Sequence, residues 1–141
     1  MLNKILKIGL GFLALLLGGG IYLLYRSHTL VYRLWPEHWL NMGQWRSTAL
    51  NVPDSVVYNL PGALWSLSYI LIIDGLDIGT DLEKRLLWTS VIPLVGAVSE
   101  LLQALGMMPG VFDICDFCCY AIPYIIYAIL KIRICNLQTN K

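Results

Sequence analysis

The stretch ILKIGLGFLALLLGGGIYLLY, residues 5–25, contains a single charged side chain, Lys7. About 20 mostly apolar residues suffice to cross the ~30 Å hydrocarbon core of a bilayer as a helix, because each residue adds about 1.5 Å. The bilayer core offers the backbone no water, so a spanning segment of this kind must be helical. Lys4 and Lys7 precede the apolar run as in a signal peptide, but no small-residue cleavage motif follows it. We therefore expect an uncleaved transmembrane helix.

Three further stretches have the same character: VVYNLPGALWSLSYILII, LLWTSVIPLVGAVSELLQAL and FCCYAIPYIIYAILKIRI, which are residues 56–73, 86–105 and 117–134. The whole chain is 57% apolar and only 13% charged, and its mean hydropathy is +0.66. Soluble domains usually carry about 25% charged residues. The sequence thus predicts an all-α, polytopic membrane protein with four transmembrane helices in one domain over residues 1–141. We expect close helix contacts at Gly18, Gly19, Gly20 and Gly96.

Basic residues near the ends of the spans predict the orientation, because cytosolic loops carry an excess of lysine and arginine. With four spans, both termini and the loop between the second and third spans lie on one side. That side holds Lys4, Lys7, Lys84, Arg85, Lys131, Arg133 and Lys141, and the other side holds Arg26, Arg33 and Arg46. We expect a membrane protein with both termini in the cytosol.

The loop between the first two spans, residues 26–55, is rich in aromatic residues. It contains three tryptophans, Trp35, Trp39 and Trp45. Indole rings favour the headgroup region, where the ring is half buried and the N–H meets water. We expect short interfacial helices here, one starting near Pro36 and ending near Gly43. A simple anchoring role for the aromatic residues is the alternative interpretation.

Polar side chains concentrate near the outer ends of the spans. Glu100 follows Arg85 by fifteen residues, which places it about 22 Å along the helix. A carboxyl group facing lipid would cost on the order of 2–3 kcal/mol or more, so we expect Glu100 to face the bundle. The candidate ligand-binding residues at this level are Glu100, Gln103, Asp113, Asp116, Asn59, Arg26 and Arg33. Asp116 also fits an N-cap of the fourth helix. No comparable polar set is expected at the midplane or in the inner half.

The cysteines allow two interpretations. Cys115 and Cys118 form a C-x-x-C pair with Cys119 adjacent, a spacing found in redox pairs and in zinc sites. A membrane thiol oxidoreductase would need a second pair as a relay, and the one remaining cysteine, Cys135, is expected on the cytosolic side. We expect small apolar helix residues here, with no metal and no cofactor.

The segment SELLQALGMMPGVFDICD, residues 99–116, resembles the signature of VanZ-like membrane proteins. That signature has Glu-x-x-Gln near the end of an apolar helix, a glycine-containing turn and then an aspartate opening the next helix. Glu100 and Gln103 match the first part, Gly110 fits the turn, and Asp116 fits the aspartate. Val111, Tyr120 and Pro123 depart from the arginine, asparagine and glycine usual in the family.

The resemblance implies a bacterial envelope protein with a role of the glycopeptide-resistance type and no established reaction. We expect a binding protein rather than an enzyme. Its candidate partners are membrane lipids and another membrane protein, without nucleic acid. Its acidic site at the outer leaflet would take an envelope amphiphile or a partner. The alternatives are an accessory subunit, an enzyme using paired acids on a lipid-linked substrate, and the thiol oxidoreductase.

Overall fold

The computed structural model describes residues 3–25, 52–79 and 81–139. This part of the chain forms four helices: α1 (Lys4–Tyr25), α4 (Asp54–Gly75), α5 (Leu82–Ala104) and α6 (Ile114–Thr139). Each helix is long and apolar enough to cross a membrane. The predicted all-α fold with four spans is therefore confirmed. The expected interfacial helices near Pro36 and Gly43, together with Arg26 and Arg33, lie outside the described residues.

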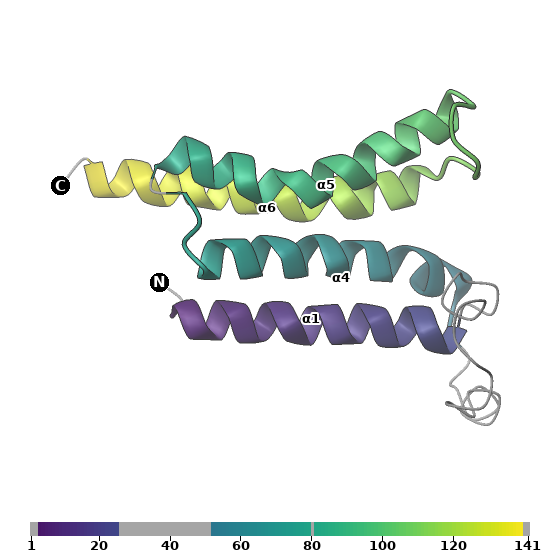
Figure 1. Ribbon diagram of the computed structural model, residues 1–141, viewed down its shortest axis with the longest axis horizontal. Helices are drawn as coiled ribbons and strands as arrows, with labels where there is room; N and C mark the ends of the chain where they lie inside the picture. The colour runs from purple at the N-terminus through teal and green to yellow at the C-terminus, as the bar shows by residue number, and fades with distance from the viewer. Residues whose placement is uncertain (1–2, 26–51, 80, 140–141) are drawn as a thin grey trace.

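Helix α4 lies between α1 and the antiparallel pair formed by α5 and α6 (Figure 1). Among the described helices, α1 packs against α4 alone, whereas α4 also contacts α5 and α6. The start of α1, the end of α6 and the α4–α5 connection lie at one end of the bundle, which we call the terminal end. The α5–α6 turn lies at the opposite end, which we call the turn end. The arrangement agrees with the predicted topology of four antiparallel passes.

Most buried residues of the described bundle are small or carry a hydroxyl group, although Ile70 is fully buried, and most large apolar side chains face outward. Ser66 and Thr89 are fully buried; the Ser66 hydroxyl donates to the Tyr120 carbonyl at 3.0 Å and the Thr89 hydroxyl to the Arg85 carbonyl at 2.8 Å. This inversion of the soluble pattern suits a bilayer, because lipid accepts apolar surface and small residues let helices approach closely.

Two glycines allow the close contacts expected from the sequence. A Cβ at Gly96 would collide with the Tyr120 ring, and a Cβ at Gly18 would lie 2.9 Å from the Trp65 ring. The other described helices make no such contact at Gly19 or Gly20, since none of their atoms would lie within 4 Å of a Cβ at either position. These two residues occupy other faces of α1, away from its seam with α4.

Candidate functional site

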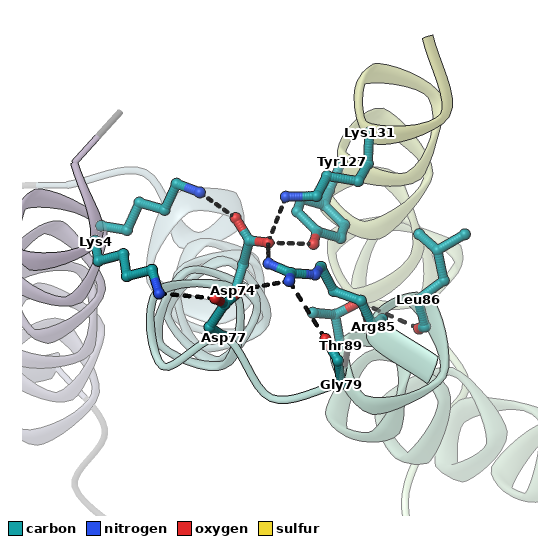
Figure 2. A network of polar contacts seen from close by, with 10 residues as sticks. Lys4, Asp74, Asp77, Gly79, Arg85, Leu86, Thr89, Tyr127 and Lys131 are labelled. Carbon is teal, nitrogen blue, oxygen red and sulfur yellow. Dashed lines mark hydrogen bonds and ion pairs between the residues drawn. The ribbon is translucent and has the colours of Figure 1, made fainter. Parts of the chain in front are cut away.

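Asp74, in the last turn of α4, is the centre of a polar cluster in which all four described helices meet (Figure 2). Its side chain is only 4% exposed. The carboxylate accepts hydrogen bonds from Lys7 at 2.5 Å, Lys131 at 2.7 Å, Tyr127 at 2.8 Å and Arg85 at 3.3 Å. One carboxylate therefore links α4 to donors on α1, α5 and α6.

A second carboxylate, Asp77, forms the rim of this cluster. It follows α4 and adopts a left-handed conformation with φ +60°, while the Ile78 N–H returns to the Ile73 carbonyl at 3.4 Å to close the helix end. Asp77 accepts a hydrogen bond from Lys4 at 2.7 Å and pairs with Arg85. The hydrogen bond from Lys4, followed by that from Arg85, holds the pKa of Asp77 below its usual value.

We call these residues the Asp74 cluster: Lys4, Lys7, Asp74, Asp77, Arg85, Tyr127 and Lys131. Four cationic side chains face two carboxylates, so the cluster carries a surplus of positive charge. An ammonium group carries three donor hydrogens. Lys7 and Lys131 each direct one of them to Asp74. The cluster thus retains both charge and donor capacity for an anion.

A cavity of about 700 Å³ opens beside the cluster. Its polar lining comes from the cluster residues and Gln138, and its apolar lining includes Leu71 of α4 and Leu130 and Ile134 of α6. Leu130 and Ile134 are 55% and 41% exposed, so this wall also borders the outer surface of the bundle. Chemically, the arrangement offers cationic donors next to an apolar surface.

The expectation that the inner half would hold no polar set is wrong. Lys7, Asp74, Arg85 and Lys131 each stand near the end of a predicted span on the same side of the membrane, so the topology alone implies a shared level. In the sequence, however, the charges of these residues predict only the orientation of the chain in the membrane and do not indicate a cluster. Tyr127 gives no signal at all, because an aromatic residue within an apolar run also fits a lipid-facing position.

At the turn end, the structure brings Glu100 and Asp113 together. Glu100 is 6% exposed, and it accepts the Asp113 backbone N–H at 3.4 Å. Gln103 packs over Gly110, where an added Cβ would lie 2.6 Å from the Gln103 side-chain oxygen. The acid and amide of the Glu-x-x-Gln segment therefore both contact the α5–α6 turn.

Asp113 occupies the position before α6 that the sequence suggested for Asp116. The Asp113 carboxylate accepts the Cys115 backbone N–H at 2.8 Å, and α6 begins at Ile114. Asp116 lies inside the first turn of α6. The capping interpretation of Asp116 is therefore replaced by Asp113, because the helix begins earlier than the apolar run at Phe117.

Two more of the predicted site residues, Asn59 and Asp116, lie at the turn end. The Tyr120 ring packs on Gly62 of α4 and Gly96 of α5. One helical turn closer to the turn end, the corresponding positions on α4, α5 and α6 are Asn59, Glu100 and Asp116. The Asn59 side-chain oxygen is buried and has no hydrogen-bond partner among the described residues.

The four cysteines form no disulfide. Cys115, Cys118 and Cys119 lie in the first turns of α6, and Cys135 lies in the cavity wall near Lys131, at the terminal end. About 24 Å of helix separates Cys119 from Cys135 at 1.5 Å per residue. Cys135 is therefore too distant to exchange directly with the C-x-x-C pair.

The comparisons with protein-family models, with curated proteins and with solved structures found no match to this chain.

Proposed function

We propose that this chain is a ligand-binding protein of the bacterial cytoplasmic membrane, with cytosolic termini, and that it binds an anionic group at the Asp74 cluster. The observation that carries the proposal is the surplus of cations, four against two carboxylates, around a cavity of about 700 Å³. A cluster that served packing alone would be expected to balance its charges, because unpaired buried charge is costly.

The chemistry of the donors favours phosphate or carboxylate. Guanidinium and ammonium groups form short, charge-assisted hydrogen bonds to such oxygens. Asp74 holds Lys7, Arg85 and Lys131 at fixed positions from three helices. An anion in the cavity would meet donors that are already ordered, so little side-chain entropy would be lost on binding.

The orientation supports a cytosolic position for this site. Seven of the ten lysine and arginine residues belong to the terminal end under the predicted topology, which is the distribution typical of cytosolic loops. A cysteine-accessibility or reporter-fusion experiment at residue 141 tests this directly. Labelling of that position from outside intact cells would overturn the orientation.

Binding is tested with the full chain in detergent, using inorganic phosphate and a short-chain phosphatidic acid as probes. Lys131→Gln is expected to weaken binding of the probes about tenfold or more, because it removes a charge-assisted contact. Arg133→Gln is the matched control, since Arg133 is an exposed cation on the same helix that does not line the cavity. Equal affinities for the two variants would contradict the proposal.

A second candidate function concerns the turn end and rests on the burial of Glu100 beside the Asp113 amide. We propose a VanZ-like role there, in which Glu100, Gln103, Asp113, Asp116 and Asn59 form an outward-facing site for an envelope amphiphile or a partner. Asn59 supports it with a buried oxygen that lacks a donor among the described residues.

The test of this second candidate is glycopeptide susceptibility of cells that carry Glu100→Gln. The variant is expected to abolish any resistance while the protein stays in the membrane. Glu83→Gln is its control, because Glu83 is an exposed acid on the same helix. Wild-type resistance in the Glu100→Gln strain would exclude the role.

A further inference from the structure

We propose that the anion at the Asp74 cluster is the phosphate of a membrane lipid, which reaches the cluster sideways from the bilayer between α1 and α6. This inference rests on the proposed function and adds the class of ligand and its route. The lipid phosphate would contact Lys7, Arg85 and Lys131, and an acyl chain would lie along Leu71 and Leu130.

The packing of the helices leaves a route into the cavity. The cavity takes its lining from Lys4 and Lys7 of α1, from α4 and α5, and from a face of α6. Within the described part of the chain, α1 and α6 do not pack against each other. Lys7 and Lys131 instead meet through Asp74, because they donate to different oxygens of its carboxylate. The cavity therefore lies over α4 between two helices whose separation leaves a lateral opening.

The cavity wall is apolar on the side that faces the middle of the bilayer. Leu71 lies three residues before Asp74 on α4, toward the bundle middle. Leu130 directly precedes Lys131 and lies on the exposed surface of α6. A small soluble anion gains nothing from this apolar surface, whereas an acyl chain buries area against it at about 25 cal/mol per Å².

The depth of the cluster also matches a lipid headgroup. Helix α4 has 22 residues, which corresponds to about 33 Å at 1.5 Å per residue. That length matches a ~30 Å hydrocarbon core. Asp74, the last residue but one of α4, therefore lies at the level where lipid phosphates begin. Cations held at this level are placed for a headgroup rather than for a ligand in the aqueous phase.

Helix α6 continues beyond that level. Eight residues follow Lys131 up to the helix end at Thr139, about 12 Å of further helix. Ile134, Cys135 and Gln138 from this extension line the cavity. The extension thus forms a wall beside the headgroup position, with a thiol close to where the lipid would be bound.

The experiment compares two tryptophan variants of the full chain in detergent. Leu130 lines the cavity and is 55% exposed, whereas Ile129 is on the same helix, is 50% exposed and does not line it. Leu130→Trp is expected to weaken short-chain phosphatidic acid binding at least tenfold while inorganic phosphate binding is unchanged. Ile129→Trp is expected to bind both probes like the wild type.

The outcomes separate this inference from the proposed function. If Lys131→Gln loses binding but Leu130→Trp binds the lipid normally, the anion site stands and the lipid route is wrong. If both tryptophan variants lose lipid binding equally, the effect is general and the route is again wrong. If Lys131→Gln changes neither probe's affinity, the proposed function and this inference both fail.

A second measurement leaves the cavity wall unaltered. In the variant Cys115→Ser, Cys118→Ser, Cys119→Ser, Cys135 is the remaining thiol, and its labelling by a maleimide is followed with time. Phosphatidic acid is expected to slow labelling at least fivefold, and phosphatidylcholine or inorganic phosphate to leave the rate unchanged. Equal protection by phosphatidylcholine, or no protection by phosphatidic acid, would overturn the inference.

Discussion

Each end of the bundle contains a buried carboxyl group, and the two groups find their hydrogen-bond partners in different ways. At the terminal end, the Asp74 carboxylate is satisfied by side chains from three other helices, and the nearest of these partners in sequence is eleven residues away. At the turn end, Glu100 and Asp113 instead accept hydrogen bonds from backbone amides at the end of the α5–α6 turn and the start of α6, 13 and 2 residues away. The first end joins the bundle together, and the second shapes one turn.

The difference also separates the ligands that the ends could take. The terminal end has an excess of cationic donors, and the turn end presents acceptors: three carboxylates and the Asn59 oxygen. A bound anion would be attracted to the first end and repelled from the second. Variants at the two ends test this contrast, beginning with the largest expected effect.

Asp74→Asn should be the most damaging single change. It leaves three cations near a neutral amide, and breaking a buried ion pair costs about 3–5 kcal/mol. The measurement is the free energy of unfolding in detergent. Asp81→Asn is the control: its pair with Lys84 at 3.0 Å has both side chains largely exposed, and such pairs contribute about 0–1 kcal/mol. Similar losses in the two variants would contradict the central position of Asp74.

Tyr127→Phe should cost less, about 1.5–3 kcal/mol, because one hydrogen bond to a charged group is lost. Tyr124→Phe on the same helix removes a bond to the neutral Leu86 carbonyl at 3.1 Å, for which about 0.5–1.5 kcal/mol is expected. Unfolding free energies of the two variants provide the comparison. A larger loss for Tyr124→Phe would show that the bond to Asp74 is the weaker of the two.

Gly110→Ala should destabilise the turn end by about 1–3 kcal/mol. Gly110 has φ +141°, and an added Cβ would meet the Gln103 side chain. Gly106→Ala is the matched variant, because Gly106 also has a positive φ, +70°, but no described atom lies within 4 Å of its Cβ position. Gly106→Ala should therefore be milder, and equal thermal shifts would argue against the Gln103 contact.

The smallest expected effect is the contribution of Asp77 to the pH dependence of stability. Its pKa is lower in the folded protein than in the unfolded chain, because Lys4 and Arg85 favour the charged form. The resulting stability is present above the unfolded pKa, near ~4, and is lost as the pH falls through the folded pKa. Asp77→Asn should therefore make the free energy of unfolding less dependent on pH in the acidic range. The measurement is unfolding of both proteins from neutral to strongly acidic pH, and identical pH profiles would contradict a stabilising role of the Asp77 carboxylate.

Much of the fold could be predicted because it depends on local composition. The third span was expected at residues 86–105 and is found at Leu82–Ala104, and the first was expected at 5–25 and is found at Lys4–Tyr25. The largest difference is at α6, which begins at Ile114 and extends to Thr139. These added residues include polar side chains at both ends, which a hydropathy criterion excludes although helix formation does not require apolar residues outside the bilayer.

The site was predicted less completely, for a related reason. The contact between Glu100 and Asp113 could be anticipated because the two residues are joined by one short turn. The Asp74 cluster could not be assembled in the same way. Lys7 and Lys131 lie at opposite ends of the chain, and nothing local indicates that both face the same carboxylate.

The sequence by itself determined that the chain forms four membrane-spanning helices, because the bilayer imposes the same length and apolarity on each of them. It also determined that Glu100 would avoid lipid. Only the tertiary structure decided which helix faces meet, that α1 packs on α4 alone among the described helices, and that cations from three helices converge on Asp74. Those features depend on helix rotation and separation, which small interior residues such as Gly18 and Ser66 set through contacts between distant segments.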